Sequence, residues 1–401
     1  MNDRGFPSPT ESRASGCRGG RGRGYLLPRT PDARQAGAAA DPRPDLRDRR
    51  PIHPIPAAMS TPSSGFLPKR LFLTGGTGLA GSHVAALFRE RDVPVRALHR
   101  PSSDTSFLEE IGCELVEGDV RDEAEDLAGA MSGCDALVHA ASLVYADLPW
   151  ARVRSINVEG TAAVFRAGVA AGIARGVHFS SVAVYGVPQG PVVDETHPVD
   201  QPLRPRERYA RSKREAEDVV REAVRGRDME VAILRPPVIY GERDRLFIPR
   251  LIGHLERRVQ VLLGSGRTPL PAVYAGNLAT AVEAALTRPL AEPVRVFNAS
   301  GDSPVSQRDL YLGLARALGK RPRFLPLPGP LVRGLARAAD ALGLQVPGLE
   351  EVSFTRAALL ATRPEPYRSD RLRGELGWEP PVEAPEAIRR TAQWFAEERA
   401  E

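Results

Sequence analysis

Short apolar runs alternate with helix-length amphipathic segments along the chain. The runs expected to form buried strands span residues 70–73, 93–98, 113–117, 135–138 and 177–180. Between them, apolar positions recur at helical spacing, as at Val84, Leu87 and Phe88. Strands that alternate with helices at intervals of about 20 to 40 residues predict a doubly wound parallel α/β sheet with helices on both faces. Ligands of such a sheet bind at the carboxyl ends of its strands.

The pattern continues beyond residue 240 with a larger share of helix. We expect strands over 272–275 and 294–298 and helices over 243–257, 277–286, 307–318, 367–376 and 387–398. The apolar stretch 325–344 is interrupted by prolines and charges, so we expect an amphipathic core helix and no membrane span. The sequence thus predicts a main α/β domain over 67–240. A smaller C-terminal α/β part, 241–401, binds the substrate and returns some strands to the main sheet.

The N-terminal extension, residues 1–66, differs from the rest in composition. Residues 1–58 contain eleven Arg, no Lys and six acidic residues, together with many Pro and Gly. Such a segment buries too little apolar surface to fold, so we expect it to be disordered. Alternatively, the natural start is Met59, and the extension is not translated. The net charge of +5 arises entirely in this segment, so charge gives no indication of a nucleic-acid partner.

The cysteine content indicates the cellular compartment. Cys17, Cys113 and Cys134 have no metal-ligand spacing and suit a reducing compartment, so we expect a cytoplasmic protein without a metal site. We expect its partner to be a small-molecule substrate.

A glycine-rich sequence, TGGTGLAG at residues 74–81, follows the first strand. Its glycines have GxxGxxG spacing: the first permits a tight turn, the second lets backbone N–H groups approach a pyrophosphate, and the third lets the next helix pack closely. A strand before and a helix after are the context this motif requires. We therefore expect a Rossmann-type dinucleotide site contacted by Gly75, Thr77, Gly78, Leu79 and Gly81.

The end of the second strand indicates which dinucleotide binds. Where NAD is preferred, an acidic residue at this position binds the ribose 2′-hydroxyl. Here the strand ends in Arg100, with Arg96, Ser102 and Ser103 nearby. A guanidinium binds a 2′-phosphate, so NADP is favoured. NAD remains the alternative, because Arg is abundant throughout the chain.

Two further strand ends are expected to contact the cofactor. Asp119, in the sequence Gly-Asp-Val with Val120, either accepts a hydrogen bond from the adenine amino group or caps the helix that starts near Asp122. Ala140 and Ala141 follow the strand 135–138 and are small enough to let the cofactor lie against its end.

Candidate catalytic residues follow the fifth strand. Ser181 lies at its end, and Tyr209 and Lys213 share one face of a later helix at i,i+4 spacing. A phenol with a pKa of about 10 is a poor base, but a nearby ammonium and an oxidised nicotinamide stabilise its phenolate. Tyr209 then exchanges a proton with a substrate oxygen that Ser181 holds in place.

Taken in order, these motifs resemble the extended short-chain dehydrogenase/reductase superfamily, which includes the NAD-dependent epimerases and dehydratases. The matching sequences are TGGTGLAG, GDV, HAAS, INVEGT, HFSSVAVYG, YARSK and LRPPVIYG. The resemblance implies that Ser181, Tyr209 and Lys213 are catalytic and that Asn157 assists through a bound water. It also implies that Lys213 holds the nicotinamide ribose, that Pro236 and Val238 pass beside the nicotinamide, and that two chains form a homodimer.

Two departures from the epimerase pattern bear on the substrate. Nucleotide-sugar enzymes of this kind usually have Asn in the segment that here reads Arg235-Pro-Pro-Val-Ile-Tyr-Gly241, and an Arg-Asp pair in the segment that here spans 267–274. Both features are missing. HAASLV, SINVEGT, RPPVIYG and PAVYAGNLA instead resemble the 3β-hydroxysteroid dehydrogenase and dihydroflavonol reductase branch, which implies hydride exchange with a hydrophobic alcohol or ketone. The alternatives are a nucleotide-sugar epimerase or dehydratase with bound NAD, and a non-catalytic NADP sensor.

Overall fold

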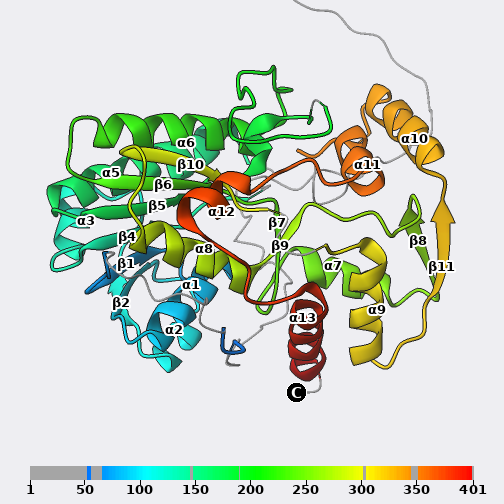
Figure 1. Ribbon diagram of the computed structural model, residues 1–401, viewed down its shortest axis with the longest axis horizontal. Helices are drawn as coiled ribbons and strands as arrows, with labels where there is room; N and C mark the ends of the chain where they lie inside the picture. Colours follow the sequence, from blue (N-terminus) through cyan, green and yellow to red (C-terminus); the bar gives the residue numbers. More distant parts are fainter. Residues whose placement is uncertain are drawn as a thin grey trace, which may run out of the picture. The chain divides into compact units, whose positions relative to one another are not determined.

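The computed structural model describes residues 52–55, 66–144, 148–188, 190–300, 304–344 and 351–399. Its centre is a seven-stranded sheet with all neighbouring strands parallel, in the order β10-β6-β5-β4-β1-β2-β3 (Figure 1). The strands are β1 (Leu71–Thr74), β2 (Val95–His99), β3 (Glu114–Glu117), β4 (Ala136–His139), β5 (Arg175–Phe179), β6 (Glu230–Arg235) and β10 (Val294–Asn298). The predicted doubly wound fold is confirmed. Its strand order reverses between β1 and β4, where such sheets bind their ligands.

Helices cover both faces of this sheet. Successive strand residues point to opposite faces, so Leu71 and Leu73 lie in one core and Phe72 lies in another. The first core includes α1 (Leu79–Glu90) and α8 (Ala275–Thr287). The second includes α3 (Ala124–Ala130), α5 (Gly160–Ala170) and α6 (Arg208–Val224). The helix that carries the predicted Tyr and Lys is therefore packed directly on the sheet.

Apart from α8, β10 and α12 (Asp370–Leu376), which belong to the sheet and its faces, the C-terminal elements are grouped beside the sheet (Figure 1). A third core joins β9 (Ala272–Tyr274), α7 (Phe247–His254), α9 (Gln307–Ala317) and α13 (Ala384–Glu398). The other described elements are α2 (Ser106–Glu110), α4 (Trp150–Arg154), a π-helical turn (Ser155–Glu159), a 3₁₀ helix (Val182–Tyr185), β7 (Val238–Tyr240), β8 (Val259–Leu263), β11 (Arg323–Leu327), α10 (Gly329–Ala341) and α11 (Phe354–Thr362).

The prediction of one core helix over residues 325–344 is wrong in two respects. The segment divides into the strand β11 and the helix α10, because Pro326 and Pro328 lack the N–H groups that a continuous helix requires, whereas Pro330 fits the first turn of α10. The apolar residues of α10 are also not all in the core, since Leu331 and Leu335 are 49% and 57% exposed. Within the described part of the chain, no helix is long and apolar enough to cross a membrane.

A short piece of the N-terminal extension is packed on the fold, unlike the prediction of disorder throughout 1–66. Ile52 and Ile55 are 6% and 3% exposed and belong to the core that contains α1 and α8. Between them, His53 Nδ1 lies 3.0 Å from the buried Glu242 carboxylate. These residues lie upstream of Met59, so a chain that starts there lacks them. The remaining predictions for this extension lie outside the described residues.

We expect Ile55→Ala to destabilise the protein by about 2 kcal/mol or more, because a buried side chain is lost from the core. Leu67→Ala makes a similar truncation at a residue that is 67% exposed and should change stability by no more than about 0.5 kcal/mol. Urea unfolding of the two variants measures this difference. Equal stabilities would show that the segment 52–55 contributes nothing to the fold.

Candidate active site

The predicted glycine turn follows β1 and leads into α1. Gly75 has φ +75°, and a Cβ there would lie 2.5 Å from the Ala141 nitrogen, so only glycine fits this turn. A Cβ on Gly81 would overlap the Gly75 carbonyl oxygen. Gly78 is exposed and is the N-cap of α1, so the first N–H groups of the helix, beginning at Leu79, come directly after the turn. This is a cradle that fits the pyrophosphate of a dinucleotide.

The end of β4 packs against this turn. Ala140 donates its N–H to the Thr74 carbonyl at 3.1 Å, and Ala141 lies beside Gly75. The preceding His139 is buried, and its Nδ1 lies 2.7 Å from Thr74 Oγ1. Burial, together with the charge of Lys213, lowers the pKa of His139 to about 3. A neutral imidazole therefore joins β1 to β4 behind the predicted cofactor residues.

The two arginines proposed for the 2′-phosphate lie in different environments. Arg96 donates to the Ala130 and Ser132 carbonyls and pairs with Glu114 at 2.8 Å. It is therefore engaged in holding β2 to the neighbouring segments. Arg100, after the carboxyl end of β2, is exposed. Of the two, Arg100 is the residue placed to meet a ligand at this edge.

Asp119 and Val120 follow β3. The Asp119 carboxylate accepts two hydrogen bonds from the Arg121 guanidinium, both at 2.8 Å. These hydrogen bonds are the main reason why the pKa of Asp119 is lowered. The expected capping role is wrong, because α3 begins after Glu123 and has no side-chain cap. Val120 is 8% exposed and packs closely on Gly160 at the start of α5.

The predicted catalytic residues meet after the carboxyl end of β5. Ser181 caps the 3₁₀ helix, where its Oγ accepts the Ala183 N–H at 3.1 Å, and Ala183 packs against Tyr209. One turn further along α6, Lys213 Nζ donates to the Phe179 carbonyl at 2.7 Å and lies 5.8 Å from the Tyr209 ring centre. All three side chains are buried, with Ser181 and Tyr209 each 8% exposed. Residues distant in sequence thus form one compact group.

Pro236 and Val238 border the same group. The Pro236 carbonyl accepts the N–H of Val182, the residue after Ser181, at 3.1 Å. Pro236 is buried, whereas Val238 is 42% exposed. The segment after β6 therefore lies beside the residues that follow β5, and its Val238 side chain is partly accessible.

Asn157 occupies the π-helical turn between α4 and α5. Its amide oxygen accepts the Leu143 N–H at 2.8 Å, and its amide nitrogen donates to the Leu143 carbonyl at 2.9 Å and to Ser212 Oγ at 3.0 Å. The side chain thus ties the loop after β4 to α6, between Tyr209 and Lys213. π-helical turns of this kind are frequent at functional sites.

A buried ion pair that the sequence analysis missed supports α6. Glu217 accepts two hydrogen bonds from the Arg235 guanidinium, at 2.8 and 2.6 Å, and a third from Ser180 Oγ at 2.6 Å. Arg235 also donates to the Tyr185 hydroxyl at 2.8 Å. The sequence feature that could have predicted this ion pair is the position of Glu217, which lies one turn beyond Lys213 on the helix face that packs on the sheet.

Two other missed contacts come from C-terminal segments. The Glu351 carboxylate accepts the Tyr209 N–H at 2.6 Å, across 142 residues of sequence. Glu242, Arg243 and Asp244 are consecutive and almost fully buried. Asp244 accepts the N–H groups at the start of α7, which explains why that helix begins later than residue 243. Three successive charged residues after Gly241 were the signal that could have revealed this turn.

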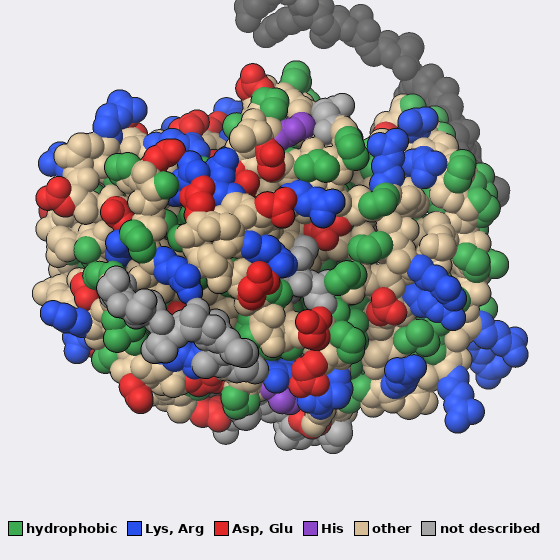
Figure 2. All heavy atoms as spheres, viewed as in Figure 1, with side chains coloured by type: hydrophobic (Ala, Val, Ile, Leu, Met, Phe, Trp, Pro, Cys, Tyr) green, Lys and Arg blue, Asp and Glu red, His purple; other side chains and the backbone are tan. Residues whose placement is uncertain are grey.

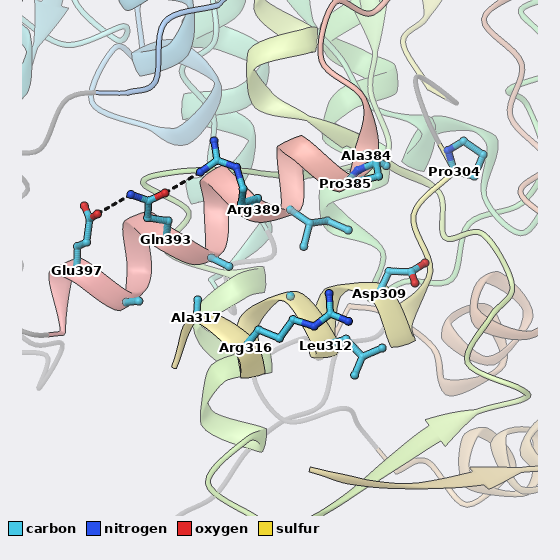
Figure 3. Close-up of a pocket in the computed structure, with 14 residues that line it drawn as sticks. Pro304, Asp309, Leu312, Arg316, Ala317, Ala384, Pro385, Arg389, Gln393 and Glu397 are labelled. Atoms are coloured by element: carbon cyan, nitrogen blue, oxygen red, sulfur yellow. Dashed lines mark hydrogen bonds between the residues drawn. The ribbon is translucent and has the colours of Figure 1, made fainter. Parts of the chain in front are cut away.

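A groove of about 870 Å³ lies between α9 and α13. Figure 3 shows Arg389, Gln393 and Glu397 along its α13 side, joined by hydrogen bonds of 2.8 Å. Its lining includes none of the predicted cofactor or catalytic residues. This groove is therefore separate from the predicted site, which is identified by the glycine turn and the Ser–Tyr–Lys group.

A parallel sheet, a glycine turn after β1 and a Ser–Tyr–Lys group at the end of β5 together define an extended-type short-chain dehydrogenase/reductase. The chain belongs to the NAD dependent epimerase/dehydratase family, whose family model matches residues 71–300. It is accordingly an enzyme of the oxidoreductase and epimerase type that uses a nicotinamide dinucleotide.

Known relatives include both reductases and epimerases. The chain is 30% identical over 312 residues to 4-hydroxy-2-methyl-3-oxo-4-farnesyl-3,4-dihydroquinoline-1-oxide ketoreductase of Stigmatella aurantiaca, covering 77% of this chain and 91% of the relative. It is 27% identical over 342 residues to UDP-glucose 4-epimerase of Vibrio cholerae, covering 82% and 96%. Among solved structures, gox2253 matches with a TM-score of 0.65 and 26% identity, over 82% of this chain and 98% of that one.

The burial of Lys213 makes stability depend on pH. Burial lowers the pKa of Lys213 from 10.5 to about 7, although the charge of Glu217 acts in the opposite direction. Between these two values the unfolded chain keeps a proton that the folded protein releases. Raising the pH therefore favours the folded state within this window.

We expect the stability of the wild type, relative to Lys213→Met, to rise between pH 7 and pH 10. The rise should be at most about 1.4 kcal/mol per pH unit. Urea unfolding of both proteins over this range measures the difference, and contributions from all other groups cancel in it. Parallel pH profiles for the two proteins would contradict the low pKa of Lys213.

Proposed function

We propose that this protein is an NADP-dependent reductase or dehydrogenase that exchanges hydride with a hydrophobic secondary alcohol or ketone. The observation that carries the proposal is the grouping of Ser181, Tyr209 and Lys213 after the carboxyl end of β5. This group lies on the strand end next to β4, whose following residues contact the glycine turn. A proton-transferring group and a dinucleotide cradle are thus on the same edge of the sheet.

The residues of the cradle would hold the cofactor. Backbone groups of Gly75, Thr77, Gly78, Leu79 and Gly81 would bind its pyrophosphate, with Ala140 and Ala141 against its middle. When bound, the nicotinamide ring supplies or accepts the hydride. Asp119 and Val120 would contact the adenine end, and Pro236 and Val238 the nicotinamide end. Asp119 reaches an adenine amino group only if it shares its carboxylate with Arg121.

Tyr209 would transfer the proton. Its hydroxyl gives a proton to a carbonyl oxygen in the reductive direction and removes one from an alcohol in the oxidative direction. Ser181 donates a hydrogen bond to the same substrate oxygen and so fixes its position. The ammonium form of Lys213 favours the phenolate of Tyr209 and would bind the nicotinamide ribose. Asn157 would hold α6 and the loop after β4 in fixed relative positions, because its side-chain amide forms hydrogen bonds with both.

A hydrophobic substrate is supported by apolar side chains beside this group. Val238 is 42% exposed, and Val144, which follows the Leu143 held by Asn157, is 40% exposed. The absence of Asn between Arg235 and Gly241 argues against a nucleotide sugar. The Stigmatella relative is named for reduction of a ketone that carries a farnesyl group. The same reaction class is therefore our proposal for this chain.

We expect Tyr209→Phe to lower turnover of a ketone substrate by at least about 100-fold, because the proton donor is lost. The affinity for the cofactor should remain nearly unchanged, as measured by fluorescence titration. Tyr311→Phe, in α9, removes a hydroxyl that contacts His254 and is the matched control, which should keep its activity. Full activity of Tyr209→Phe would refute the assigned proton transfer.

We expect NADPH to bind at least tenfold more tightly than NADH, a difference of about 1.4 kcal/mol. Arg100→Ala should abolish this preference, whereas Arg227→Ala, another exposed arginine, should preserve it. Fluorescence titration of both cofactors measures it. Equal affinities, or NAD that copurifies with the protein, would instead favour the epimerase alternative, in which the hydride returns to the substrate.

A further inference from the structure

Large exposed hydrophobic side chains are concentrated in one part of the protein. Of the twelve among the described residues, seven belong to β8, β11 and α10 with its C-terminal turn: Val259, Val261, Leu325, Leu331, Leu335, Leu342 and Leu344, each between 46% and 76% exposed. Single exposed hydrophobic residues are ordinary, but a concentration of this kind marks an interaction surface. We refer to these seven residues as the apolar surface.

The helix α10 has two apolar faces, and only one is covered. Val332 and Ala336 are buried and pack with Ala358 of α11. Leu331, Leu335 and Leu342 recur at helical spacing on an adjacent, exposed side of the helix. The covered face therefore holds α10 on the protein, and the exposed leucines lie outside the buried cluster that does so.

The two-stranded sheet beside α10 repeats this arrangement. In β8, Gln260 and Leu262 are buried, whereas Val259 and Val261 are about half exposed. Leu325 of β11 is paired directly with Val261, so the exposed residues of both strands share one face. β11 is joined to α10 by the single residue Pro328. The apolar surface is thus made of neighbouring elements.

The surroundings of the apolar surface are basic. Residues 256–263 and 320–344 contain seven Lys or Arg and only two acidic residues. Both acids are engaged: Glu256 pairs with Lys320 at 2.8 Å, and Asp340 accepts the Phe354 and Thr355 N–H groups. Five arginines are exposed here, namely Arg257, Arg258, Arg321, Arg323 and Arg337. Figure 2 shows hydrophobic and basic side chains together over this region.

We propose that the apolar surface docks on an anionic phospholipid bilayer. Exposed leucines along a helix, with arginines beside them, are the combination that inserts into the interface of such a membrane. The arginines complement its negative surface potential. A second copy of this chain fits less well, because face-to-face pairing would bring the five arginines against their own equivalents. This inference goes beyond the proposed reaction and does not depend on it.

Vesicle flotation of the full chain tests the proposal. We expect the protein to float with vesicles of phosphatidylcholine mixed with phosphatidylglycerol, and to bind pure phosphatidylcholine vesicles about tenfold less. The double variant Leu331→Asn/Leu335→Asn should lose at least about tenfold of the binding, because the inserted side chains become polar. Arg323→Gln/Arg337→Gln should lower binding to the anionic vesicles only.

Matched controls show whether the apolar surface itself binds the vesicles. Leu67→Asn changes a leucine that is 67% exposed outside the apolar surface, and this variant should bind vesicles like the wild type. Circular dichroism checks that each variant is folded. Turnover of a water-soluble ketone should be the same in the leucine double variant as in the wild type, so the proposed reaction is tested separately.

Three results would overturn the proposal. The first is absence of binding to anionic vesicles by the folded wild type. The second is equal binding by the wild type and a folded Leu331→Asn/Leu335→Asn variant. The third is a dimer, measured by light scattering, that this double variant dissociates while the wild type ignores vesicles; the surface would then be an interface between copies of the chain.

Discussion

The active-site helix depends on the buried ion pair between Glu217 and Arg235. Both side chains are less than 5% exposed, and two hydrogen bonds join them. Burial by itself raises the pKa of Glu217, but the hydrogen bonds and charge of Arg235 outweigh it, so the net direction is downward. Removing one member of such a pair leaves a buried charge, at a cost of about 3 to 5 kcal/mol. The pair therefore attaches α6 to the end of β6 and fixes the rotation of the helix about its own axis.

That rotation determines what Tyr209 and Lys213 face. The three residues Tyr209, Lys213 and Glu217 follow each other at i,i+4 intervals, so fixing the last of them orients the other two. Lys213 then meets the Phe179 carbonyl at the end of β5. Burial destabilises the charged ammonium of Lys213, which is why its pKa is low. Such perturbed pKa values are typical of functional sites. The ion pair that stabilises α6 and the predicted catalytic residues thus share one helix face.

The sequence was sufficient for the features that are local. The glycine turn, its strand and its helix lie within twenty residues, and the i,i+4 pair of Tyr209 and Lys213 follows from helix geometry alone. Ion pairs and contacts that join distant segments were missed, such as Glu217 with Arg235 and Glu351 with the Tyr209 N–H. No periodicity relates residues 142 positions apart. For α10, periodicity identified an apolar stripe but not which apolar residues the rest of the chain covers.

The contact with Glu351 joins the C-terminal part directly to the start of α6, at the predicted catalytic Tyr209. The first N–H groups of a helix lack partners within the helix, and here a buried carboxylate from the segment before α11 accepts one of them, that of Tyr209 itself. A second buried pair, Arg356 with Glu207 at 3.6 Å, joins α11 to the residue before the same helix. Any shift of α11 is therefore transmitted to the start of α6. The C-terminal part, which we propose binds the substrate, thus helps to set the position of Tyr209, the proposed proton donor, so in this proposal substrate fit and catalytic geometry depend on the same few contacts.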